Sequence, residues 1–103
     1  MSRFQAMIRA WPTSELPRFS LGQTYFDAGM FELAESTFAE LCEMKPDYMM
    51  AYVLRTKALA ELSRYLEARQ TCRTAIRLAQ EQNHRSVLAE CEWLLAEIES
   101  ELP

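Results

Sequence analysis

The chain has 103 residues, of which 50% are hydrophobic and 25% are charged, and its formal net charge is −4 at pH 7. These values are typical of one soluble globular domain. The negative charge argues against nucleic acid as the default partner, because phosphate binding depends on clustered positive charge. No apolar run approaches the length of a membrane span, and the N-terminus is too polar for a signal peptide. We therefore expect a cytoplasmic protein with no membrane partner.

Three widely spaced cysteines, Cys42, Cys72 and Cys91, fit neither a disulfide framework nor a metal site built from close cysteine pairs. A reduced environment and the absence of a metal are expected. We expect Cys42 and Cys72 to be small core residues. Cys91 is expected on an accessible surface, where it could be oxidised.

Apolar residues recur at spacings of three and four along almost the whole chain, which predicts helices. Only two glycines and four prolines interrupt the pattern, too few for a hairpin-rich β fold. Thr13 and Ser14 precede one helix, and Gly29 suits a left-handed helix end. Pro46 ends a helix, and Asp47 offers a cap for the next.

Ser63 and Asn83 are expected as weaker caps further along the chain. The pattern predicts an all-α fold of about six helices, at about residues 3–10, 15–28, 31–44, 48–62, 65–81 and 84–101.

Residue types repeat when the chain is shifted by 34 residues. Ala34 then aligns with Ala68, and Phe31 aligns with Tyr65. A helix-turn-helix unit of this period is typical of the tetratricopeptide repeat.

The first copy, LGQTYFDAGMFELAESTFAELCEMKP, closely resembles the tetratricopeptide repeat signature. The matching residues are Leu21, Gly22, Tyr25, Gly29, Phe31, Ala34, Phe38 and Pro46. The second copy departs from the signature at Arg55, Thr56 and Gln80. The resemblance covers about residues 15–82 and implies tandem antiparallel helix pairs in a right-handed superhelix. The whole layout is similar to small bacterial tetratricopeptide repeat proteins of unassigned function.

We expect a single domain over residues 1–103. It consists of an N-terminal capping helix at 1–12, repeats at 15–48 and 49–82, and a C-terminal capping helix at 84–101. Because one repeat cannot bury its own apolar faces, the flanking helices are expected to cover them.

The resemblance implies that the first helix of each repeat lines a concave groove. The residues that the resemblance places in this groove are Phe19, Gln23, Phe26, Asp27, Met50, Val53, Lys57 and Glu61, followed on the last helix by His84, Val87, Cys91 and Leu94. The six predicted to bind a partner are Phe19, Gln23, Phe26, Met50, Val53 and Lys57. Such an apolar surface is typical of a scaffold that binds a protein or peptide segment. The clamp with which related co-chaperones hold a carboxylate is absent, because its positions carry Phe19, Gln23, Leu54, His84 and Leu88.

Two alternatives stay open. The same apolar surface can be covered in a structural homo-oligomer such as a homodimer. A weaker alternative is an anion- or RNA-associated module through Arg69, Arg73 and Arg77, which stand four apart on one helix face. Glutamates nearby favour a solvated outer face for this row instead. Whether the N-terminal helix covers the groove is also open.

No sequence motif of an enzyme is present: there is no nucleophile elbow, phosphate-binding loop, zinc-protease motif or pair of catalytic carboxylates. The single histidine, His84, has no partner residues at catalytic spacing. We expect a noncatalytic protein with no catalytic residues and no cofactor.

Overall fold

The computed structural model describes residues 2–103. Six helices follow one another: α1 (Ser2–Ala10), α2 (Glu15–Asp27), α3 (Phe31–Met44), α4 (Met49–Glu61), α5 (Tyr65–Glu81) and α6 (Arg85–Ser100). No strand forms within these residues. The predicted all-α fold is confirmed, and every helix end lies within one residue of its expected position. Met1, the first residue of the predicted N-terminal segment, lies outside the described residues.

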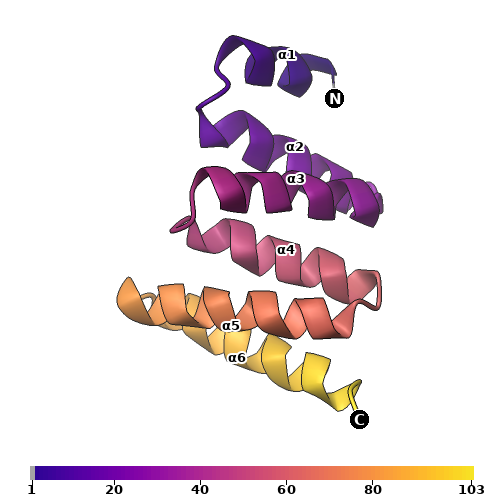
Figure 1. Ribbon diagram of the computed structural model, residues 1–103, viewed down its shortest axis with the longest axis vertical. Helices are drawn as coiled ribbons and strands as arrows, with labels where there is room; N and C mark the ends of the chain where they lie inside the picture. The colour runs from indigo at the N-terminus through magenta and orange to yellow at the C-terminus, as the bar shows by residue number, and fades with distance from the viewer. Residues whose placement is uncertain (1) are drawn as a thin grey trace.

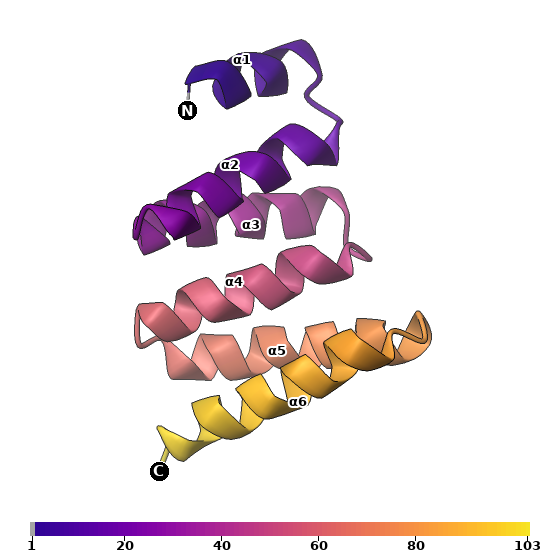
Figure 2. The ribbon, with the colours of Figure 1, turned by 180° about the vertical axis from the view of Figure 1, so that it is seen from behind.

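The helices stack one after another along a body of 42 × 29 × 19 Å (Figure 1). From α1 to α6, each helix packs against its neighbours in the chain, and α2 also touches α4. Figure 1 shows α3 and α5 in front, whereas α2, α4 and α6 face the viewer in Figure 2. We call the surface of α2, α4 and α6 the A face, and the surface of α3 and α5 the B face.

The buried core runs between the two faces. Ala34 and Ala68, which the 34-residue repeat aligns, are both 0% exposed, as close packing between helices requires. Phe38 is the largest fully buried side chain, and Cys72 takes the equivalent position in the second repeat. The repeat in the sequence is therefore also a repeat in the packing.

Three helices end in the same kind of turn, in which Gly29, Ser63 and Asn83 adopt φ values of 77°, 59° and 55°. In the second turn, the Arg64 N–H donates to the Leu59 carbonyl at 2.9 Å, and equivalent bonds close the other two. This pattern is the Schellman motif, which satisfies the last carbonyls of a helix. The expectation that Ser63 and Asn83 cap the next helix was wrong, since both residues end the preceding one.

Gly22 provides a test of the close packing in the first repeat. A Cβ atom added at this residue would lie 2.6 Å from Cε1 of Phe38, whose side chain is 0% exposed, so the ring would have to shift within the core. We expect Gly22→Ala to lower the free energy of unfolding by about 1–3 kcal/mol, measured by urea denaturation.

The matched control is the double variant Gly22→Ala/Phe38→Leu. The leucine that replaces Phe38 is smaller and relieves the clash with the added Cβ atom. The double variant should therefore lose less unfolding free energy than the sum of the losses in the two single variants. Strict additivity would contradict the proposed contact.

Candidate functional site

The A face presents partly exposed apolar side chains from three successive helices. They are Phe26 of α2, Met50 and Leu54 of α4, and Leu94 of α6. Each of them also packs against the buried core. The core therefore holds these side chains in place while part of each remains available for contact.

Ion pairs gather on the opposite side of the molecule. Nearly all of them involve α3, α5 or the turn before α5: Arg18–Glu40, Arg55–Glu35, Arg64–Glu32, Arg64–Glu35, Arg73–Glu99 and Arg77–Glu81. One further pair, between Lys57 Nζ and Glu90 Oε1 at 2.9 Å, bridges α4 and α6. The two faces therefore differ in their ion pairs: of the seven between described residues, six involve α3, α5 or the turn before α5, and only Lys57–Glu90 joins two helices of the A face.

The predicted groove residues of α2 differ in exposure. Gln23 is exposed and Phe26 is half-buried. Phe19 is half-buried too, but its ring stacks on Tyr48 at a centroid distance of 5.7 Å and meets Phe38 edge-on at 6.2 Å. Phe19 thus fixes the packing between helices, whereas Gln23 and Phe26 are open to a partner.

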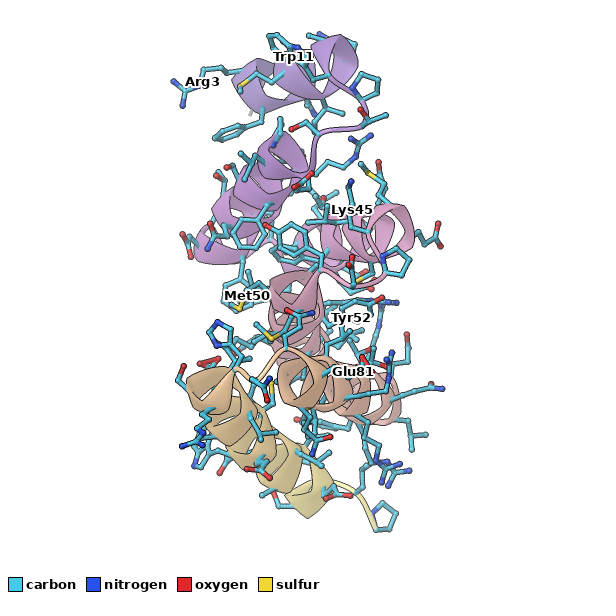
Figure 3. All side chains as sticks on the ribbon, turned by 90° about the vertical axis from the view of Figure 1, so that its left-hand side faces the viewer. Arg3, Trp11, Lys45, Met50, Tyr52 and Glu81 are labelled. Atoms are coloured by element: carbon cyan, nitrogen blue, oxygen red, sulfur yellow. The ribbon has the colours of Figure 1, made fainter. Side chains whose placement is uncertain are left out.

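The predicted groove residues of α4 separate in the same way. Figure 3 shows Met50 on the side of the molecule where α6 lies, and Tyr52 on the other side of α4. Val53 is only 1% exposed and packs in the core, so it supports the A face from below. The Lys57 side chain is 34% exposed and lies in its ion pair with Glu90.

The N-terminal helix packs at the end of the stack, beyond α2 (Figures 1 and 2). Phe4 and Ile8 anchor it to the core cluster that contains Leu21 and Tyr25. Trp11, just after the helix, is 61% exposed. In this position α1 does not lie over α4 and α6.

The arginine row on α5 is partly neutralised. Arg73 Nη2 lies 3.5 Å from Glu99 Oε2, and Arg77 Nη1 lies 3.1 Å from Glu81 Oε1. Exposed pairs of this kind contribute little stability, but they reduce the positive potential that an anion would need. The arrangement favours a solvated outer face for this row.

No helix of the described chain is both long and apolar enough to cross a bilayer. Over residues 2–103, no three His, Cys, Asp or Glu side chains gather in a way that could hold a metal ion.

The family model of the tetratricopeptide repeat matches residues 18–48, which contain most of α2 and all of α3. A tetratricopeptide repeat domain protein from Salinibacter ruber is 27% identical, with a TM-score of 0.78 over 86% of this chain and 90% of that one. A protein from Bordetella parapertussis is 26% identical, with a TM-score of 0.82 over 97% and 87% of the two chains.

The fold is also that of the TPR2B domain of yeast Sti1, solved as a complex with pHsp70. That domain is 19% identical, with a TM-score of 0.89 over 95% of this chain and 78% of the other. Comparison with curated proteins gives no match.

All three cysteines are buried. This confirms the expectation for Cys42 and Cys72 and contradicts the one for Cys91, which is 0% exposed. The Cys72 thiol donates to the Cys91 carbonyl at 3.3 Å, because α6 packs this side of its surface onto α5. Burial raises the pKa of the Cys42 thiol to about 11, and Arg55 offsets only part of the effect. The Cys42 thiol is therefore protonated at neutral pH, and a buried, protonated thiol is a poor nucleophile.

The Cys42 thiol provides a pH-dependent test. Since its pKa is higher in the folded chain than the ordinary value of 9.0, the stability it contributes is complete below pH 9 and is lost as the pH rises toward 11. We expect the fall in unfolding free energy between pH 8 and pH 10.5 to be larger in the wild type than in Cys42→Ala. Urea denaturation at both pH values measures it, and equal falls would contradict the assignment.

Proposed function

We propose that this tetratricopeptide repeat protein is a noncatalytic interaction module that binds a segment of a partner protein on its A face. The binding surface is the predicted groove, in which Gln23, Phe26, Met50 and Lys57 are accessible to a partner. The other two predicted residues, Phe19 and Val53, support this surface from the core. The observation that carries the proposal is the contrast between the faces: ion pairs gather on the B face, and partly exposed apolar side chains on the A face.

The chemistry of these side chains favours apolar contact as the main source of affinity. Phe26 and Met50 are partly anchored in the core, so a partner that covers them orders few additional rotamers. The Phe26 ring meets Phe31 edge-on at 5.1 Å, which fixes its orientation. Gln23, exposed beside them, supplies hydrogen-bonding groups.

The fold is compatible with recognition of another protein. The TPR2B domain of yeast Sti1, which shares this fold, forms a complex with pHsp70. Its 19% identity to this chain limits the likeness to the fold, so the proposal takes no partner from it.

The alternative occupant of the A face is a second copy of the chain. Multi-angle light scattering over a concentration series tests it directly. We expect the 12.0 kDa mass of one chain at every concentration. A mass of twice that value, reduced to one chain by Gln23→Arg, would instead support a structural homodimer.

Two exposed glutamines provide a matched test of the binding face, since Gln23 lies on α2 and Gln70 on α5. Peptides selected from a random display library against the wild type serve as probes, with affinity measured by fluorescence polarisation. We expect Gln23→Arg to weaken binding about tenfold or more, because a long charged side chain blocks an apolar contact surface. Gln70→Arg adds the same charge to the B face and should leave affinity unchanged.

Phe26→Ala is the second variant, and it should also weaken binding while the chain stays folded by circular dichroism. If both A-face variants bind as the wild type does, or if Gln70→Arg is equally impaired, the A face is not the binding surface.

A further inference from the structure

A cavity of about 390 Å³ lies where the C-terminal halves of α4 and α6 meet the start of α5. Its lining comes from both ends of the turn after α4 and from two turns of α6: Ala60, Glu61, Ser63, Tyr65, Trp93, Leu94, Glu97, Ile98 and Glu101. Six of these residues lie on α4 or α6, which are helices of the A face: Ala60, Glu61, Trp93, Leu94, Glu97 and Ile98. The cavity therefore adjoins the surface proposed to bind a partner.

Three carboxylates line this cavity, from Glu61, Glu97 and Glu101, and all three residues are exposed. None of them forms an ion pair with a described residue. Three basic side chains of α4, α5 and the turn between them are engaged with other glutamates: Lys57 with Glu90, Arg64 with Glu32, and Arg73 with Glu99. Arg69 of α5 forms no ion pair with a described residue, and no basic residue lines the cavity. The carboxylates of the cavity therefore have no ion-pair partner among the described residues.

The ends of two helices add to the negative electrostatic potential of the cavity. α4 ends at Glu61 and α6 at Ser100, and both C-termini border the cavity. The C-terminus of a helix carries a partial negative charge, which favours a cation nearby.

The remaining walls are aromatic and apolar. Trp93 is 64% exposed, so much of its indole is accessible to a ligand. Tyr65 is half-buried, and Ile98, at 2% exposure, closes the lining from the side of the core. A ligand that fits here carries both a positive charge and a flat or apolar surface.

We propose that this cavity binds the side chain of an arginine from the partner segment. A guanidinium group is planar and always charged, it stacks on aromatic rings, and it forms paired hydrogen bonds with carboxylates. Its aliphatic stem suits the apolar part of the wall. The inference rests on the proposed function, because the arginine belongs to a segment that continues along the A face from Phe26 and Met50.

The two tryptophans of the chain make the cavity directly observable. Trp11→Phe leaves Trp93 as the only indole, so its fluorescence reports on this cavity alone. The probe is acetyl-Arg-Arg-Arg-amide, and the control peptide carries citrulline, a neutral isostere, at all three positions. We expect a saturable change of Trp93 emission with the arginine peptide and none with the citrulline peptide.

Charge-matched variants locate the response. Glu97→Gln/Glu101→Gln removes two carboxylates from the cavity and should weaken binding of the arginine peptide about tenfold. Glu43→Gln/Asp47→Asn removes the same charge from exposed residues at the other end of the B face and should leave affinity unchanged. Equal weakening in both double variants would show attraction to net charge alone and overturn the proposal.

Two further results separate the alternatives. If Trp93 emission changes with protein concentration alone, and Arg3→Gln/Arg9→Gln abolishes the change, the cavity receives α1 of a second copy and the proposal is overturned. If Phe26→Ala and Gln23→Arg leave partner binding intact while the arginine peptide still binds, the A-face function fails and the arginine site stands by itself.

Discussion

The fold depends on how closely the two helices of each repeat can approach. In the first repeat the contact is made by Gly22 and the ring of Phe38. In the second repeat the equivalent residues are Thr56 and Cys72, both 0% exposed. In the first repeat a small residue, Gly22, is paired with a large one, Phe38. In the second repeat the larger Thr56 is paired with the smaller Cys72. The combined volume between the helices is roughly kept, which is the condition under which core exchanges are tolerated.

This exchange explains two departures from the repeat signature. A threonine can replace the usual glycine because its buried hydroxyl donates to the Tyr52 carbonyl at 2.7 Å, so no polar group is left unsatisfied. A cysteine at the Phe38 position leaves less bulk between α5 and α6. Cys91 then packs directly on Cys72, which places it in the core rather than on the A face.

The helices could be predicted from the sequence because periodicity and helix-ending residues are local signals. Local signals fail where one residue type serves two purposes. Serine and asparagine are both favoured at helix starts, and asparagine also occurs at left-handed helix ends, so residue type alone does not distinguish the two roles. The positive φ of Ser63 and Asn83 places both at the end of the preceding helix. From α2 to α6, no residue at a helix start makes a side-chain capping hydrogen bond, so these helices depend on packing.

The groove residues were predicted by helix face, and a helix face does not determine burial. Val53 lies deeper than Met50 because its side chain enters the core cluster that α4 forms with α5 and α6, a tertiary effect without a sequence signal. The cavity at the end of α4 was missed for a related reason. Glu61 and Glu97 are far apart in the chain, and whether a glutamate is already paired depends on which arginines come near it. The available signal was Trp93, a large apolar residue on a helix rich in glutamates.

The distribution of chemistry along the A face gives a bound segment a direction. Near α2 the face offers Phe26, and near the ends of α4 and α6 it offers carboxylates that form no ion pair with a described residue, beside Trp93. Apolar contact is nondirectional and tolerates sliding, whereas a charge-assisted hydrogen bond to fixed carboxylates does not. An arginine held at the α6 end would therefore fix the register of a segment whose affinity comes mainly from apolar contact. A sequence that lacks the arginine would retain part of the affinity and lose its orientation, so specificity and affinity would be carried by different ends of the same face.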